Sequence, residues 1–245
     1  MEEAKLVREA HYREYQENPA AVCRSNGRFH LIGEHSWFCK DKTLSMAVNI
    51  PVYVAVSKRD DSSLRCYFHQ LDDRKKSSVM NLKFKKEDKW ANAVKAIVYG
   101  FSSGGYSIPG LNITIFSDIL PSAGFGITTA IKIAAAFSIR KLLDLPCSQT
   151  QLLQVIERGN KFFLKIENHI ADNFAAIFAK EDTVILTDHA KGTYDLLPFN
   201  CNDKVILLTD AYVANGSGAF RLPDLNGMAD INPPYVPEEL KGSWT

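Results

Sequence analysis

The stretch 120–143, LPSAGFGITTAIKIAAAFSIRKLL, contains the change of pattern on which the fold depends. Small residues surround Gly124 and Gly126, and apolar periodicity then predicts a helix from about Thr128 to residue 143. The preceding segment 111–119, LNITIFSDI, has the composition of a strand. A strand, a glycine-containing loop and a helix in this order present unpaired backbone N–H groups at a helix N-terminus, where anions bind.

Two interpretations of this loop stay open from its own residues. Glycines allow a phosphate to approach the backbone closely, and the hydroxyls of Thr128 and Thr129 add donors or hold a metal through water. Alternatively, Gly124 and Gly126 only serve a tight turn. The loop is not a Walker A motif, because no Gly-Lys-Ser/Thr follows, and it is not a Rossmann fingerprint.

The remaining chain mixes helical and strand patterns without a regular β-α-β alternation. A polar DDSS turn suggests that the strand at 46–59 forms a hairpin with the strand at 64–70. The pattern therefore predicts an α+β fold. Besides the helix that begins at about Thr128, the predicted helices are 1–18, 90–101, 148–166 and 167–182. The predicted strands are 46–59, 64–70, 111–119, 183–188 and 204–210.

Composition narrows the class of protein. With 245 residues, 46% of them hydrophobic, the chain can bury a substantial core. The formal charge of +1 provides no basic footprint for nucleic acid. Five cysteines without a C-x-x-C pair argue against a disulfide framework and a zinc site. The charged N-terminus is no signal peptide, and no run of about 18 apolar residues is present. We therefore expect a soluble cytoplasmic protein that binds neither nucleic acid nor membrane.

Two further segments carry candidate functional side chains. In 26–35, NGRFHLIGEH, the polar residues Arg28, Glu34 and His35 flank an apolar core, which fits either a site or a short strand with a polar end. Asp172 lies among apolar residues near the start of a predicted helix, where it either favours the helix dipole or serves chemistry. Spacing alone leaves both alternatives open.

Together, these segments resemble a known family. GRFHLIGEH, AVNIPVYVAVSKRD, WANAVKAI, YSIPGLNITI, LPSAGFGITTA and IADNFAAIFAKEDTVILTD occur in the order and spacing of the galactokinase branch of the GHMP small-molecule kinases. The resemblance covers roughly residues 20–213. It implies a two-layer GHMP N-terminal domain at 20–200, preceded by an N-terminal helix at 1–19 and followed at 201–245 by the start of a truncated or divergent second α+β domain.

The resemblance also implies residue roles. Asp172 is the catalytic base and Arg28 its electrostatic partner, while Glu34 and His35 bind sugar hydroxyls. An arginine keeps a neighbouring aspartate ionised, and a positioned carboxylate accepts the proton of an attacking hydroxyl. The residues implied to cradle the ATP phosphates are Gly124, Gly126, Thr128 and Thr129. The implied cofactors are ATP and Mg²⁺, with Thr128 as the candidate metal contact.

Departures from the family pattern occur at four places. Trp37 replaces an aspartate that binds the sugar in galactokinases, and Gly126 and Ile127 replace serines of the phosphate loop. Asn160 stands where the family commonly has a glutamate that helps to hold magnesium, and ENH at 167–169 replaces a small PCG segment. Galactokinases also continue well beyond the length of this chain.

Two functions follow from these matches and departures. The first is ATP-dependent phosphorylation of a hexose, galactose or a related sugar, at its anomeric hydroxyl to give a sugar 1-phosphate. The second is a catalytically weak pseudokinase that binds sugar or nucleotide and acts as a sensor or a partner of another protein. The identity of the sugar and the oligomeric state do not follow from the residues.

Overall fold

A computed structural model describes residues 2–34, 40–119, 124–166 and 170–199. All of them belong to one compact unit, Met1–Val205. The predicted strand at 204–210 and the predicted second domain at 201–245 lie outside the described residues, and the predicted domain boundaries stay a prediction. No helix among the described residues is long and apolar enough to cross a membrane.

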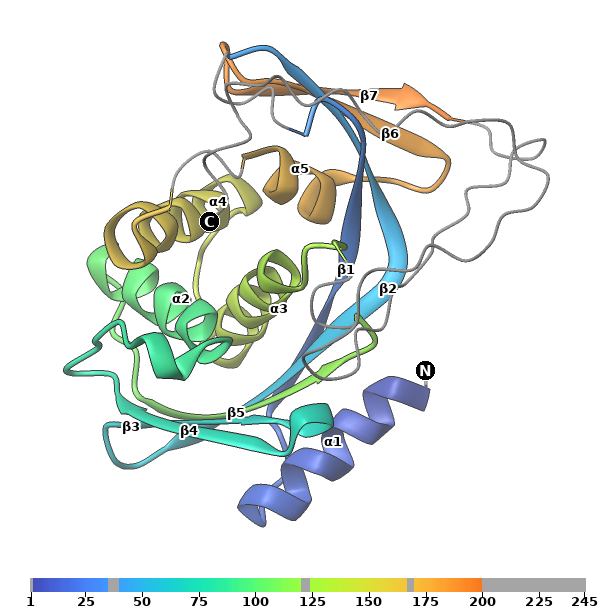
Figure 1. Ribbon diagram of the computed structural model, residues 1–245. Helices are drawn as coiled ribbons and strands as arrows, with labels where there is room; N and C mark the ends of the chain where they lie inside the picture. Colours follow the sequence, from blue (N-terminus) through green and yellow to red (C-terminus); the bar gives the residue numbers. More distant parts are fainter. Residues whose placement is uncertain (1, 35–39, 120–123, 167–169, 200–245) are drawn as a thin grey trace, which may run out of the picture. The chain divides into compact units, whose positions relative to one another are not determined.

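The described residues are built on a seven-stranded sheet (Figure 1). The strand order is β4-β3-β5-β2-β6-β7, and β1 pairs with β2 outside this path. Only β3 and β5 pair in parallel; the other pairs are antiparallel. The strands are β1 (Ala21–Ile32), β2 (Lys42–Arg59), β3 (Ser63–Phe68), β4 (Asp73–Ser78), β5 (Gly110–Ser117), β6 (Thr183–Asp188) and β7 (Thr193–Pro198).

Strand β2 is the spine of the sheet. It pairs with β1 between residues 44 and 56, with β5 at 52–59 and with β6 at 42–45. The pairing with β1 shifts register between Asn26 and Gly27, where Pro51 lies opposite. Proline has no backbone N–H for the ladder, so an irregularity is the position at which a long strand tolerates it.

The predicted hairpin between 46–59 and 64–70 is wrong. Strand β3 pairs with β4 and with β5, and β5 lies between β3 and β2. The side chains of Ile113 and Ile115 on β5 are fully buried, so placing β5 in the interior of the sheet buries more apolar surface than placing it at an edge. The short DDSS turn joins two strands that are not neighbours.

Alternate side chains of β2 serve two different layers. Val52, Val54 and Val56 belong to the main core, whereas Tyr53 and Ala55 pack with Val7 of the N-terminal helix. This is the period-two alternation of a strand with both faces covered. Helix α1 (Glu2–Tyr15) therefore covers one face of the sheet and the other helices cover the opposite face (Figure 1).

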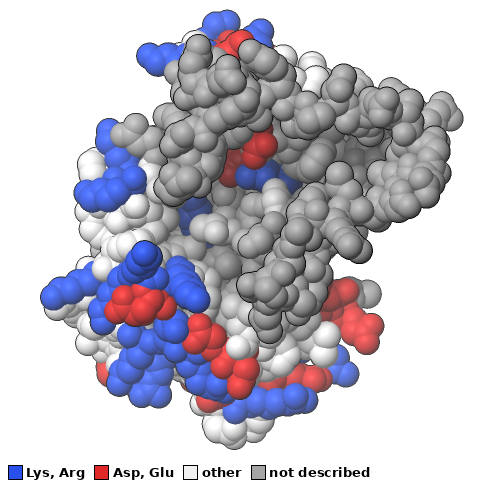
Figure 2. Space-filling view, viewed as in Figure 1, with Lys and Arg blue, Asp and Glu red and all other residues white. Residues whose placement is uncertain are grey.

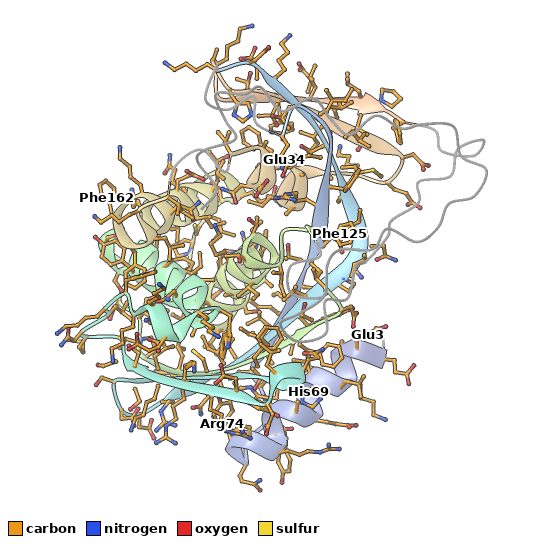
Figure 3. The ribbon with its side chains drawn as sticks, in the orientation of Figure 1. Glu3, Glu34, His69, Arg74, Phe125 and Phe162 are labelled. Atoms are coloured by element: carbon orange, nitrogen blue, oxygen red, sulfur yellow. The ribbon has the colours of Figure 1, made fainter. Side chains whose placement is uncertain are left out.

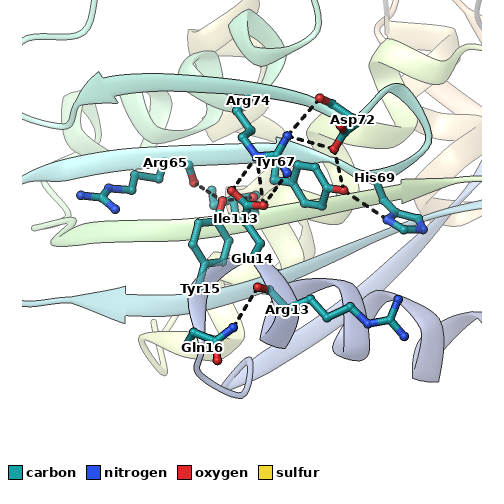
Figure 4. Close-up of polar contacts among 10 residues, drawn as sticks. All are labelled: Arg13, Glu14, Tyr15, Gln16, Arg65, Tyr67, His69, Asp72, Arg74 and Ile113. Carbon is teal, nitrogen blue, oxygen red and sulfur yellow. Dashed lines mark hydrogen bonds and ion pairs between the residues drawn. The ribbon is translucent and has the colours of Figure 1, made fainter.

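Polar contacts fix α1 on its face (Figure 4). The hydroxyl of Tyr15 donates to the carbonyl of Ile113 at 3.1 Å, and Glu14 accepts from Arg74 on β4 at 2.8 Å. The fully buried imidazole of His11 lies within hydrogen-bond distance of Thr114 and Ser57. The helix is thus tied to three strands of the sheet.

Four helices form the second layer, as expected for the predicted α+β class, which is confirmed. They are α2 (Ala91–Ser103), α3 (Ile127–Leu142), α4 (Gln149–Arg158) and α5 (Ile170–Phe178), with short turns η1 (His69–Leu71), η2 (Lys86–Asp88) and η3 (Gly159–Leu164). Ser148 caps α4 in a reciprocal capping box with Gln151. The predicted helix 148–166 is divided, because its second part forms the π-helical turn η3. Helix α3 packs on β1 and β2, and α5 packs on β1, β2 and β6.

Charges on the face seen in Figure 2 are interspersed. Basic side chains gather at the lower end of this view, where acidic side chains lie between them. Another acidic group lies beside basic atoms near the centre of the upper half of this view (Figure 2).

Candidate functional site

The centre of the candidate site is an ion pair between β1 and α5. Arg28 Nε donates to Asp172 Oδ1 at 2.7 Å, and Arg28 Nη2 donates to Oδ2 at 3.3 Å. Both side chains are largely buried. The forked guanidinium matches the two oxygens of a carboxylate, so this contact fixes the orientation of Asp172 as well as its charge. The structure thus brings together the two residues predicted to be catalytic, which lie 144 positions apart.

His30 is a site residue that the sequence reasoning missed. Its Nε2 lies 2.7 Å from Asp172 Oδ1, and its Nδ1 lies 2.9 Å from Ser45 Oγ. A carboxylate beside an arginine is an acceptor, so Nε2 carries the proton and donates. The signal was available, because residues two apart on a strand share a face and His30 follows Arg28 at that spacing.

The glycine loop lies against the same ion pair. Arg28 Nη1 donates to the carbonyl of Gly124 at 2.6 Å, and the backbone N–H of Arg28 donates to the carbonyl of Phe125 at 2.9 Å. Figure 3 shows Phe125 beside β1 at the start of α3. Gly126 has a φ of 71°, and a Cβ there would lie 3.1 Å from Arg28 Cγ. A side chain at this position would therefore displace the arginine that orients Asp172.

The two threonines of the loop differ in environment. Thr129 is buried and its hydroxyl donates to Asp172 Oδ2 at 3.3 Å. Thr128 is exposed in the first turn of α3, where helix N–H groups are unpaired. Thr129 thus adjoins the carboxylate, and Thr128 borders the end of the helix that an anion would approach.

A largely buried polar network joins α3 to η3, α4 and α5. Lys132 Nζ donates to Asn160 Oδ1 at 2.7 Å, and Asn160 Nδ2 lies 3.5 Å from Glu157 Oε1. Asn173 Nδ2 donates to the same glutamate oxygen. Burial lowers the pKa of Lys132 to about 8, against the opposing effect of the Asp172 and Glu157 carboxylates. The sequence reasoning missed both Lys132 and Glu157.

The residues around Asn160 do not fit a magnesium ion in the way that the resemblance implies. The amide oxygen that would replace a carboxylate ligand accepts a hydrogen bond from an ammonium. A magnesium ion bound to this amide oxygen would lie close to the Lys132 ammonium, and the two cations would repel each other. Magnesium also prefers carboxylate or water ligands. Among the described residues, no group of three or more His, Cys, Asp or Glu side chains is arranged to hold a metal.

The predicted sugar-binding pair is described in part. Glu34 is exposed just beyond the end of β1, on the side of α5 (Figure 3). The hydroxyl of Thr43 donates to the carbonyl of Gly33 at 2.7 Å and lies 2.7 Å from His189 Nε2, which anchors this end of β1 to β2 and β6. Predicted or divergent positions outside the described residues are His35, Trp37 and residues 167–169.

Trp90 has partners of a structural kind. Its indole N–H donates to Asp73 Oδ2 at 2.9 Å, and its ring meets that of Phe68 edge-on at 5.5 Å. These contacts join the start of α2 to β3 and β4.

Two family descriptions match the chain. The galactokinase galactose-binding signature matches residues 9–58, which include Arg28 and Glu34. The GHMP kinases N terminal domain matches residues 90–180, which include the glycine loop and Asp172. Together they contain every described residue of the candidate site.

Two relatives similar in sequence are named as galactokinases. A Treponema pallidum (strain Nichols) protein whose name assigns it provisionally to the galactokinases is 40% identical over 207 residues, 84% of this chain and 52% of that protein. Galactokinase of Streptococcus thermophilus is 27% identical over 187 residues, 75% of this chain and 48% of that enzyme. The chain spans about half the length of the curated relatives it matches.

Solved structures share the fold. Lactococcus lactis galactokinase, crystallised with galactose, matches with a TM-score of 0.71 at 19% identity, over 84% of this chain and 57% of that one. Methanococcus jannaschii mevalonate kinase matches with a TM-score of 0.59 at 14% identity, over 72% of this chain and 55% of that one. These two structures show the fold, and the two matched family descriptions with the named relatives show that the chain belongs to the galactokinase family of the GHMP kinases.

Proposed function

We propose that this chain acts as a sugar kinase in the cytoplasm. It transfers the γ-phosphoryl group of ATP to the anomeric hydroxyl of a hexose, galactose or a related sugar, and produces a sugar 1-phosphate. The observation that carries the proposal is the Asp172 carboxylate, which is buried, bound by Arg28 at 2.7 Å and adjacent to the glycine loop.

Asp172 is held in place by several donors among the described residues. Oδ1 accepts hydrogen bonds of 2.7 Å from Arg28 and His30, and Oδ2 accepts hydrogen bonds of 3.3 Å from Arg28 and Thr129. These donors keep the carboxylate ionised and fixed in orientation. As the anomeric oxygen attacks the γ-phosphorus, its proton passes to the Asp172 carboxylate, and the bond from the γ-phosphorus to the bridging oxygen of ADP breaks.

The phosphates of ATP bind at the loop 124–126 and the N-terminus of α3. Gly124 presents open space, since a Cβ there would meet no atom within 4 Å. Thr128 offers its exposed hydroxyl, and the guanidinium of Arg28 offsets charge on the transferred group. Thr128 is the residue that we propose would contact a magnesium ion bound with the nucleotide, and such an ion would neutralise phosphate charge.

The sugar binds at the end of β1. Glu34 contributes a carboxylate that accepts hydrogen bonds from sugar hydroxyls, with His35 as its proposed companion. The match to a galactose-binding signature over residues 9–58 favours galactose as the first sugar to test.

The test is formation of sugar 1-phosphate from galactose and Mg-ATP by the purified chain. Asp172→Asn removes the base while keeping the size of the side chain, so we expect turnover to fall by about 10²-fold or more. Asp195→Asn, the same chemical change at an exposed position of β7, is the control and should leave turnover unchanged. Equal turnover in the wild type and Asp172→Asn would contradict the assigned role.

The pseudokinase is the second candidate. The contact between Lys132 and Asn160 favours the pseudokinase, because Asn160 stands where the family commonly has a magnesium-binding glutamate and its amide oxygen is bonded to an ammonium. Binding of galactose or ATP by the wild-type chain without any product would support this candidate over the kinase, and a protein partner would then be sought.

A further inference from the structure

Lys132 is a buried lysine that takes no part in the reaction proposed above. Its side chain is 1% exposed, and it lies on α3 one turn after Thr129. Residues three apart share a helix face, and long helical side chains point back toward the N-terminus. The ammonium therefore lies toward the N-terminal part of α3, where it contacts Asn160 of η3.

Among the described residues, the hydrogen-bond acceptor of the Lys132 ammonium is an amide oxygen, and the Asp172 and Glu157 carboxylates act on the ammonium through their charge. Its 2.7 Å acceptor is the neutral amide of Asn160. The nearby carboxylates have other donors: Asp172 accepts from Arg28 and His30, and Glu157 accepts from Asn173. Burying an ammonium is costly unless the protein or a ligand compensates it.

We propose that Lys132 is a built-in cation of the phosphate site, which takes over part of the charge neutralisation that a protein-bound magnesium would provide. This inference rests on the proposed function, because it assumes that ATP phosphates bind at the loop. In a low-dielectric interior a charge acts over several ångströms with little screening, and here it adds to the positive end of the helix dipole. The neutral amide of Asn160 orients this ammonium without cancelling its charge.

The inference predicts weak dependence of nucleotide binding on metal. Isothermal titration with ATP is carried out on the full 245-residue chain, once with Mg²⁺ and once with EDTA. For the wild type we expect the two Kd values to differ by less than about threefold, since the fixed cation remains in both conditions. In Lys132→Met, binding of metal-free ATP should weaken by about tenfold or more, while binding of Mg-ATP weakens less.

Two further variants separate the effect of the Lys132 charge on ATP binding from its effect on folding stability. Lys95 is also a fully buried lysine, but it lies on α2 and donates to Asp88 and to the carbonyl of Lys83. Lys95→Met should lower the melting temperature without changing the ratio of the two Kd values. Asn160→Asp keeps the ammonium and sets a carboxylate against it, so it should raise the Kd for metal-free ATP even if Lys132→Met fails to fold. This variant is read in EDTA alone, because a carboxylate at position 160 can itself bind magnesium.

The outcomes are distinct. A folded Lys132→Met or Asn160→Asp chain with the wild-type Kd for metal-free ATP overturns the inference and leaves the proposed function intact. A wild type whose ATP binding is abolished by EDTA overturns it as well. A wild type that binds ATP in neither condition overturns the proposed function and this inference together.

Discussion

At the scale of single residues, side chains of β1 orient the Asp172 carboxylate. Short hydrogen bonds from Arg28 and His30 converge on Oδ1. Ser45 bonds the other nitrogen of His30 and keeps the ring in place. His30 acts through Asp172, so we regard it as a positioning residue.

Replacement of His30 tests this positioning role. His30→Leu removes the donor to Oδ1, and the loss of one charge-assisted hydrogen bond should lower kcat by about tenfold or more with little change in the KM for sugar. His30→Gln places an amide N–H near the position of Nε2 and should restore most of kcat. Steady-state kinetics of both variants provide the measurement, and a Leu variant with the kcat of the wild type would refute the role.

At the scale of elements, the glycine loop and β1 are joined through Arg28. The arginine donates from its backbone to Phe125 and from its guanidinium to Gly124, while Gly126 lies against its side chain. The loop, the start of α3 and the pair of Arg28 and Asp172 are therefore one mechanical unit. A change in the conformation of residues 124–126 should be transmitted to Asp172 through Arg28.

Two glycine variants test this coupling. Gly124 and Gly126 have φ values of 78° and 71°, so an alanine at either is strained by about 1 kcal/mol. Only at Gly126 does a Cβ meet Arg28, at 3.1 Å from Cγ. Thermal unfolding should show similar losses for Gly124→Ala and Gly126→Ala, while kcat should fall further in Gly126→Ala. Equal turnover in the two variants would count against the coupling.

At the scale of the whole described unit, the site is assembled from segments that are distant in the chain. Arg28 and His30 come from β1, the loop and Lys132 from α3 and its approach, and Asp172 from α5. These elements meet because α3 and α5 both pack against β1 and β2. The geometry of the candidate site therefore depends on the sheet that α1 covers from the opposite face.

The stability of this unit should depend on pH through His11. Burial lowers the pKa of His11 from 6.5 to about 4, with Glu17 opposing the shift. Because the folded pKa is below the unfolded value, the contribution of neutral His11 is complete above pH 6.5 and is lost as pH falls toward 4. We expect a loss of up to about 1.4 kcal/mol per pH unit in this window.

Urea unfolding between pH 7 and 4 measures this dependence. His11→Gln can keep hydrogen bonds to Ser57 and Thr114 but does not titrate, so its stability should fall less steeply over that range. His69→Gln, at a partly exposed histidine, should retain the slope of the wild type. A His11→Gln chain with an unchanged slope would show that other groups cause the dependence.

The sequence by itself determined the class of fold, most of the helices and strands, the family and the residues Arg28 and Asp172. Periodicity reports which face of an element is buried, and the signature segments fix the family, since both are local properties of the chain. The loop with Gly124 and Gly126 was likewise visible as a strand-to-helix junction.

Only the tertiary structure decided which elements and side chains are neighbours. The pairing of β3 with β5 in place of β2, the contact of His30 with Asp172 and the burial of Lys132 against Asn160 join residues far apart in sequence. Strand partners are chosen by the apolar area that the whole sheet buries, and short turns do not determine them. A buried polar contact exists only when two packed elements bring both partners together, and for this reason the sequence pointed to Asp172 as a candidate but not to His30 and Thr129 as its donors.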